Sequence, residues 1–162
     1  MVKGFYLDTF HRGKEALGAA DAGLAIDPNS ATLYAVRFGA ETSLGHFEQA
    51  KSDILQAMRL SPRDPFIDQW QLSLGDAELG LGHLDAAIDA YHKSIDLGFH
   101  AFPPYVDLAA AYALEGKMEE AKPALAEALR LNPQLTVKWL QTVAPNLPPL
   151  FEGARKAGLA EE

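Results

Sequence analysis

Tyr105–Pro133 reads YVDLAAAYALEGKMEEAKPALAEALRLNP and contains two amphipathic helical patterns joined by a turn. Apolar or small residues recur at the spacing i, i+3, i+4 and i+7, which is the spacing of one helix face. Gly116 lies between the patterns, where glycine can end a helix in the left-handed conformation at little steric cost. Pro133 cannot continue the second helix, because it lacks an N–H and disfavours the α conformation of the preceding residue. The stretch predicts a helix–turn–helix unit whose two helices bury their apolar faces together.

The turn of this unit recurs along the chain. Glycine, an apolar residue two positions later and alanine five positions later occur at Gly45–Ala50, Gly82–Ala87 and Gly116–Ala121, and His11–Ala16 is a degraded copy. The closing alanines are 34 or 37 residues apart. A fixed period of this size indicates a solenoid, and about 34 residues with two helices is the tetratricopeptide period. Alanine suits this position because the two helices cross closely there.

The chain therefore resembles a tetratricopeptide-repeat (TPR) protein over nearly all its length. The last repeat fits the family pattern best. Its matching residues are Tyr105, Leu108, Ala109, Tyr112, Gly116, Ala121, Leu125, Ala128 and Pro133. The second repeat departs at Arg37 and Glu41, where apolar residues are usual, and the third has Phe99 where a closing proline is expected. The resemblance implies an all-α, right-handed α-α superhelix of roughly three and a half to four repeats.

We predict a domain of TPR repeats over residues 1–133, followed by a C-terminal pair of capping helices with a tail over 134–162. A truncated first repeat occupies 1–30 and the others 31–64, 65–101 and 102–133. The predicted helices are 3–11, 14–26, 31–44, 47–60, 66–81, 84–97, 103–115, 118–131, 136–143 and 147–157. The three additional residues of the third repeat are expected to lengthen its first helix. Because the first repeat lacks its opening turn, we expect a chain cut from a longer protein or an end that something covers.

Composition excludes several function classes. Fourteen basic and 22 acidic residues give a net charge of −8, which disfavours nucleic acid as a partner. The chain has no cysteine and therefore no disulfide, thiol nucleophile or cysteine-based zinc site. We find no signal peptide and no apolar run long enough for a membrane span. We expect a soluble cytoplasmic protein that binds neither nucleic acid nor membrane.

Two sets of polar residues are candidates for catalysis or metal binding. Asp85, Asp89 and His92 fall on one face of a predicted helix, where they could act as acid and base or bind a cation. The simpler interpretation is a solvated face. His46 and His83 occupy the same position of successive repeats, just after the turn glycine, but a zinc site needs three or four converging ligands. We predict no catalytic residue, no metal site and no cofactor.

The resemblance also implies a concave groove lined by the first helix of each repeat. Its predicted binding residues are Thr32, Ala35, Gly39, Thr42, Gln69, Leu72, Asp76, Leu79, Val106, Ala110 and Ala113, with Pro103 beside them. Repeats that clamp the carboxylate of a chaperone tail carry Lys, Arg and Asn here, so that ligand class is not expected. Small residues let a partner backbone approach closely, which favours a helix or an apolar peptide. The alternative is a groove filled by the chain's own missing N-terminal part or by a second copy.

A narrower resemblance concerns two short segments. Residues 57–65 (AMRLSPRDP) and 151–159 (FEGARKAGL) look like TPR segments that end bacterial class III adenylate/guanylate cyclases. The catalytic domain of those enzymes is not among the residues of this chain, so the resemblance implies a regulatory context and no cyclase activity.

The leading hypothesis is a non-enzymatic module for protein–protein contacts, acting as the regulatory end of a larger bacterial signalling protein. The alternative is a free-standing small enzyme, metal binder or ligand binder that uses the face of Asp85, Asp89 and His92.

Overall fold

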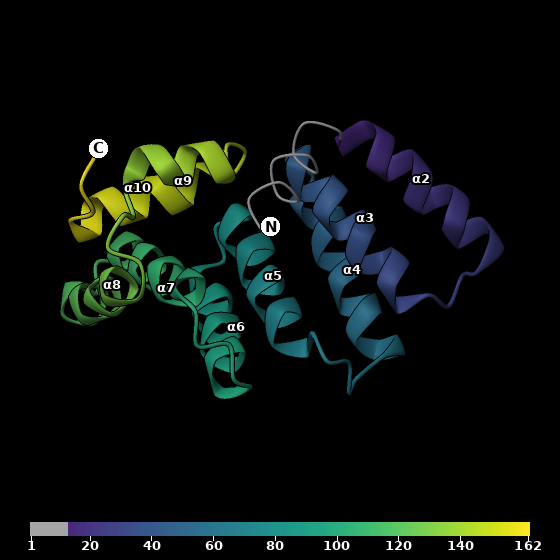
Figure 1. Cartoon of the computed structure of the whole chain (residues 1–162), viewed down its shortest axis with the longest axis horizontal. Coiled ribbons are helices and arrows are strands. Elements are labelled where there is room, and N and C mark those ends of the chain that lie inside the picture. The colour runs from purple at the N-terminus through teal and green to yellow at the C-terminus, as the bar shows by residue number, and fades with distance from the viewer. Residues whose placement is uncertain (1–12) are drawn as a thin grey trace.

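The computed structural model describes residues 13–162, and within that range the chain forms nine α-helices and no strand (Figure 1). The helices are α2 (Gly13–Ile26), α3 (Ala31–Ser43), α4 (Phe47–Leu60), α5 (Ile67–Gly80), α6 (Leu84–Asp96), α7 (Phe102–Glu115), α8 (Met118–Leu131), α9 (Val137–Val143) and α10 (Pro148–Ala157). The all-α prediction is confirmed. The helix predicted over 3–11 lies outside the described residues. None of the helices in 13–162 is both long and apolar enough to cross a bilayer.

Successive helices pair as hairpins, and the hairpins stack side by side. The pairs α3–α4, α5–α6 and α7–α8 pack most closely, while α2 packs on α3, α4 on α5 and α6 on α7. Figure 1 shows this row running from α2 at one end to α8 at the other. Each hairpin therefore buries its apolar faces partly within itself and partly against its neighbour, as a solenoid requires.

Glycine sets the turn inside each of the three complete hairpins. Gly45, Gly82 and Gly116 have φ angles of 77°, 78° and 83°, in the left-handed region that glycine adopts without steric cost. The predicted left-handed role of Gly116 is confirmed. The same conformation occurs at Gly98 and Gly158, just after α6 and α10.

The third repeat does not lengthen its first helix. Helix α5 contains 14 residues, the same number as α7. The additional residues lie mainly in the connection between α4 and α5, where 61–66 contain six residues, compared with four in 27–30 and five in 97–101. The prediction of a longer helix is wrong, because irregular connections absorb added residues without disturbing helix packing.

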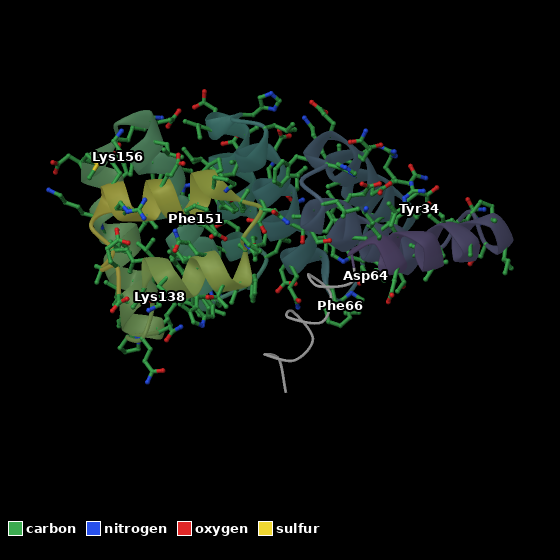
Figure 2. The ribbon with its side chains drawn as sticks, turned by 90° about the horizontal axis from the view of Figure 1, so that it is seen from above. Tyr34, Asp64, Phe66, Lys138, Phe151 and Lys156 are labelled. Carbon is green, nitrogen blue, oxygen red and sulfur yellow. The ribbon has the colours of Figure 1, made fainter. Side chains whose placement is uncertain are left out.

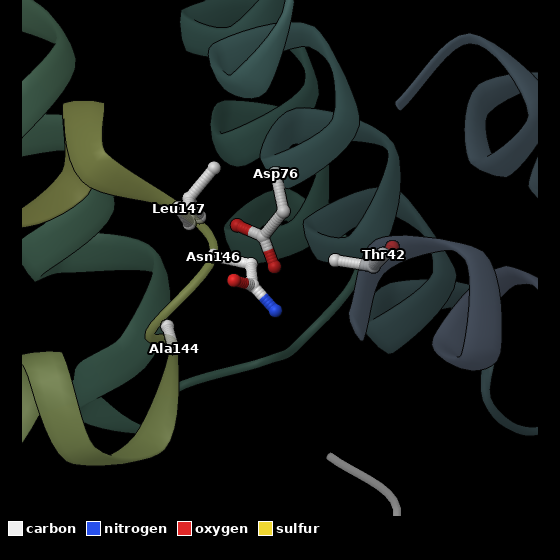
Figure 3. A pocket seen from close by; sticks show the side chains of 5 residues that line it. All are labelled: Thr42, Asp76, Ala144, Asn146 and Leu147. Atoms are coloured by element: carbon white, nitrogen blue, oxygen red, sulfur yellow. The ribbon is translucent and has the colours of Figure 1, made fainter. Parts of the chain in front are cut away.

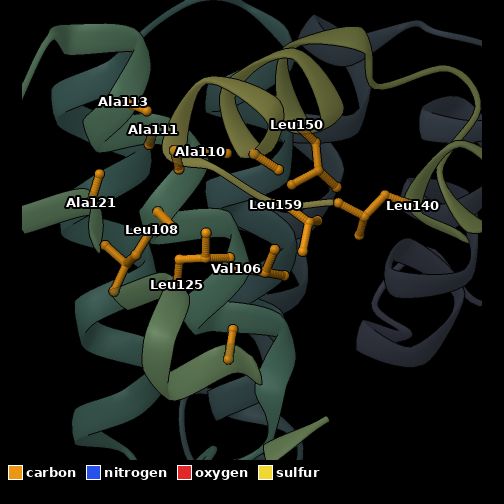
Figure 4. Close-up of a cluster of buried hydrophobic side chains, with 14 of the residues drawn as sticks. Val106, Leu108, Ala110, Ala111, Ala113, Ala121, Leu125, Leu140, Leu150 and Leu159 are labelled. Atoms are coloured by element: carbon orange, nitrogen blue, oxygen red, sulfur yellow. The ribbon is translucent and has the colours of Figure 1, made fainter. Parts of the chain in front are cut away.

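Close helix crossings depend on residues with little or no side chain. A Cβ atom on Gly75 would lie under 3 Å from the ring of Tyr91, which is fully buried between α5 and α6. The crossing alanines Ala50, Ala87 and Ala121 are also fully buried. The larger of the two buried clusters extends from Leu79 to Leu159 and joins the third and fourth repeats to the C-terminal helices (Figure 4).

Arg37, unusual for its repeat position, forms a structural ion pair. Its guanidinium bonds the Asp53 carboxylate at 2.5 and 2.9 Å and reaches Asp21 at 3.1 Å. The carboxylate of Asp53 is almost completely buried, so this two-pronged pairing compensates its charge. Arg37 thereby connects α2, α3 and α4.

The C-terminal pair folds back onto the fourth repeat. Thr136 caps α9 by accepting a hydrogen bond from the Trp139 N–H at 3.1 Å. The end of the chain returns to this point, where the Val137 N–H donates to the Ala160 carbonyl at 2.8 Å. Helix α9 packs chiefly on α10, and α10 packs chiefly on α7 (Figure 1). The pair therefore covers one face of α7, the first helix of the fourth repeat.

Candidate binding groove

One cleft is lined by predicted groove residues of two repeats and by the segment that connects the two C-terminal helices. Thr42 of α3 and Asp76 of α5 line it together with Ala144, Asn146 and Leu147, which connect α9 to α10 (Figure 3). The side-chain amide of Asn146 donates to the Ser43 carbonyl, a contact across 103 residues of sequence. The C-terminal segment therefore lies over the side of the repeats that their first helices line.

Helix α10 covers the part of this surface that belongs to α7. Val106, Ala110 and Ala113, predicted as groove residues, are 1%, 0% and 0% exposed. At Gly153 of α10 the two backbones approach so closely that a Cβ atom would overlap the Ala110 carbonyl. As folded, these three residues cannot contact a partner unless α10 moves. The occupant that the structure shows is a C-terminal helix of the same chain, whereas the alternative suggested by the sequence was a missing N-terminal part or a second copy.

The remaining predicted groove residues differ in accessibility. Thr32 and Gln69 are exposed. Those that are half-buried are Ala35, Gly39, Thr42, Leu72, Asp76 and Pro103. Leu79 is fully buried in the core and is not available to a partner in this conformation. The accessible positions thus lie on α3, on α5 up to Asp76, and at Pro103 in the first turn of α7.

Two carboxyl groups meet between the third and fourth repeats. Asp76 accepts a hydrogen bond from the hydroxyl of buried Tyr91 at 3.1 Å, and Asp107 of α7 is 5% exposed. Burial raises the pKa of Asp76 to about 7, although the bond from Tyr91 acts in the opposite direction. Burial and the neighbouring charge of Asp76 raise the pKa of Asp107 well above its usual value. A second negative charge at this position is therefore strongly disfavoured.

The two matched histidines each pair with a buried glutamate that the sequence analysis missed. Nδ1 of His46 lies 2.6 Å from the Glu41 carboxylate, and Nδ1 of His83 lies 2.8 Å from that of Glu78. Glu78 also pairs with Lys51 of the preceding repeat at 2.8 Å. A signal was available, because the two glutamates, like the two histidines, are 37 residues apart. The pairs lie at the hairpin turns and fix the second helix to the first.

The predicted alternative site does not assemble. Asp85 has a side chain that is 91% exposed, and its nearest cation is Lys117 at 3.9 Å. A ring nitrogen of His92 instead lies 2.7 Å from the Tyr112 hydroxyl. Across residues 13–162, no three histidine, aspartate or glutamate side chains converge as a metal site would require.

Comparison with known proteins agrees with this architecture. Residues 103–135 match the family model described as tetratricopeptide repeat. Two crystal structures of MamA have TM-scores of 0.68 and 0.67, each at 20% sequence identity. The fold is that of a tetratricopeptide-repeat solenoid. The all-α superhelix predicted from the repeat period is confirmed.

These similarities span most of each chain. The two MamA alignments cover 90% and 95% of this chain and 86% of each MamA chain. A third structure, YrrB, is described as a TPR protein with an unusual peptide-binding site. It has a TM-score of 0.65 at 18% identity, over 93% of this chain and 79% of that one. At these identities the likeness concerns the fold, and no catalytic family is indicated among these matches.

Proposed function

We propose that this chain is a non-enzymatic module that binds a protein or peptide partner on the concave surface of its TPR solenoid. The observation that carries the proposal is the close packing of α10 on α7. This surface already binds an amphipathic helix of the same molecule. Helix-in-groove binding is a recurring mode of peptide recognition. The similarity to YrrB, itself described with a peptide-binding site, supports the same function.

The binding residues that we propose lie on α3 and α5, where the concave surface is not covered by α10. Thr32 and Gln69 are exposed here, and small Ala35 is half-buried against the cluster of Ile54, Ala57 and Trp70. The −8 net charge favours a partner with basic residues. The partner is a helix or an extended peptide supplied by another protein.

Partner capture tests this assignment. Thr32→Arg combined with Gln69→Arg places two long charged side chains on the proposed surface, and both positions are exposed, so the fold tolerates them. Ser52→Arg, exposed on the outer helix α4, is the matched control. We expect co-purification of the partner to fall about tenfold or more for the double variant and to stay unchanged for the control. Equal capture by all three proteins would contradict the proposal.

The cellular context that we propose is the regulatory segment of a larger cytoplasmic signalling protein of bacteria, such as an adenylate or guanylate cyclase. Its support is the sequence resemblance of 57–65 and 151–159 to the tails of those proteins. An immunoblot of the native organism tests the context by apparent mass. A band well above 17.5 kDa is the expected result. A band at 17.5 kDa would contradict the context and leave the binding function untouched.

A further inference from the structure

We propose that the α7 face is a second helix-binding site of the groove, which α10 fills as an internal ligand and from which a partner helix with the same small-residue face can displace it. This inference deepens the proposed function and rests on it. It concerns α7, whereas the surface tested by Thr32→Arg and Gln69→Arg lies on α3 and α5.

The contact between α10 and α7 defines what the site accepts. The buried positions of α10 are Leu150, Gly153, Ala154 and Ala157, spaced as one helix face. Gly153 lies directly on the Ala110 backbone, and a side chain there would have to displace the main chain of α7. Small residues at a crossing let two helices approach closely. The site therefore requires glycine at this point and an aliphatic residue one turn before it.

The opposite face of α10 describes the rest of the partner. Arg155 and Lys156 are exposed in its last turn, where cations interact favourably with the helix dipole. Lys138 and Lys156 lie on the α9–α10 pair (Figure 2), where Lys138 pairs with Glu162 at 2.8 Å and Arg155 pairs with Glu161. Exposed Glu152 and the tail glutamates balance these cations, so the outer face is polar and mixed in charge. The partner that fits is an amphipathic helix with a glycine–alanine face and a polar outer surface.

The way in which α10 is attached makes its exchange feasible. Helix α9 and the tail 160–161 are bound to each other. The Trp139 ring contacts Phe102 at the start of α7, at 5.6 Å between centroids, and outside α7 the unit is held by the Asn146–Ser43 bond and by smaller contacts of α10 with α8 and α5. Docking also holds Leu147 over the cleft that Asp76 borders. When the Asp76 carboxyl ionises, contact with water stabilises it, and more water reaches it only if the segment of Leu147 moves away. The C-terminal unit can therefore leave the repeats without breaking any hairpin.

The probe is a synthetic peptide with the sequence of residues 145–160, and the receptor is the full chain carrying Gly153→Val. The substitution expels α10 from its own site and leaves α7 unaltered. We expect the labelled peptide to bind this variant saturably. Binding to the wild-type chain should be at least about tenfold weaker, because the tethered α10 competes at an effective concentration on the order of millimolar. A peptide with Glu152→Ala, an exposed position, should bind equally well, and one with Gly153→Val should not bind.

A second measurement keeps the test decisive if the Gly153→Val chain does not fold. Hydrogen exchange of the α10 amides is followed in the wild-type chain as the unmodified peptide is added at millimolar concentration. Exchange in α10 should accelerate several-fold while the α5–α6 hairpin keeps its protection. The inference is overturned if a folded Gly153→Val chain does not bind the unmodified peptide, if the Gly153→Val peptide binds as tightly as the unmodified one, or if α10 exchange does not change.

Discussion

At the scale of single residues, the most consequential feature is a pair of aspartate carboxyl groups. Among residues 13–162, no cationic side chain pairs with either of them. Asp76 and Asp107 lie between the third and fourth repeats, with the Tyr91 hydroxyl as the hydrogen-bond donor to Asp76. The pKa of Asp76 is raised to about 7, so the folded chain holds this proton more tightly than the unfolded chain does. The associated stability is full below the unfolded pKa of 3.8 and is lost as pH rises through about 7.

Asp76→Asn should remove this loss, because an amide still accepts the Tyr91 bond but cannot ionise. We expect the variant to gain unfolding free energy relative to wild type between pH 5 and pH 8, on the order of 1 kcal/mol for a carboxyl partly open to solvent. Urea unfolding at the two pH values measures the difference. Asp89→Asn, at an exposed position of α6, is the control and should show no such trend. A constant difference for Asp76→Asn would argue against a proton held at this site.

The pKa of Glu78 is shifted in the direction opposite to that of Asp76. Burial alone would raise its pKa, but the Lys51 ammonium and His83 together lower it below the ordinary 4.5. Its contribution to stability is therefore present above pH 4.5 and is lost as pH falls through the lower folded value. Lys51 belongs to the second repeat and Glu78 to the third, so the pair connects two hairpins.

Glu78→Gln should cost about 1–3 kcal/mol of unfolding free energy at pH 7, because the buried amide replaces a charged partner of Lys51. The cost should shrink below about pH 4, where the wild-type carboxylate also becomes protonated. Chemical denaturation across this range measures both effects. Glu48→Gln, exposed in the first turn of α4, should be close to neutral throughout. A cost that does not depend on pH would indicate packing rather than the ion pair.

At the scale of elements, the spacing between helices depends on glycine. Gly75 of α5 admits the buried Tyr91 ring of α6, whereas Gly18 of α2 has no atom within 4 Å of the place where a Cβ would be. The two glycines have the same backbone cost in a helix and differ only in their surroundings.

Replacing each by alanine separates these contributions. Gly75→Ala should destabilise the chain by about 1–3 kcal/mol, since the ring must shift within a packed core. Gly18→Ala should instead stabilise it by about 0.5–1 kcal/mol through helix propensity. Thermal unfolding of both variants measures the difference in sign. Equal effects would mean that α5 and α6 are not packed as closely as described.

The positions of most helices were predictable from sequence, because helix periodicity and turn residues are local features. The helix periodicity and the turn glycine gave the bounds of α4 and α8 directly. The length of α5 was not predictable, because added residues can enter a helix or a connection and only packing decides between them. A capping pair on the fourth repeat was predicted, but the contact of α10 with the groove positions of α7 was not, because it depends on tertiary contact between two small-residue surfaces. A signal existed in the sequence, because Gly153, Ala154 and Ala157 give one face of this helix very small side chains, which suits close contact with another helix.

At the scale of the whole molecule, the solenoid fills part of its own concave surface. The resemblance to the TPR family implied that surface, and the candidate residues were named from the positions of the family's repeat. The period could not show that α10 lies on Val106 and Ala110, since the C-terminal pair lies outside the repeats. Ala110→Arg, an attractive substitution from sequence alone, would therefore disturb α10 docking and is not a clean test of partner binding.

The most direct test of this arrangement is an intramolecular cross-link between the second repeat and the C-terminal segment. The chain has no cysteine, so Thr42→Cys with Asn146→Cys introduces a unique pair on the two sides of the cleft. A short bis-maleimide should link this pair within one chain, giving a faster-migrating monomer on a denaturing gel. The control pair Ala25→Cys with Asn146→Cys, whose first position is exposed in the last turn of α2, should remain unlinked. Cross-linking only between separate chains, or none at all, would contradict a groove closed by its own C-terminal helix.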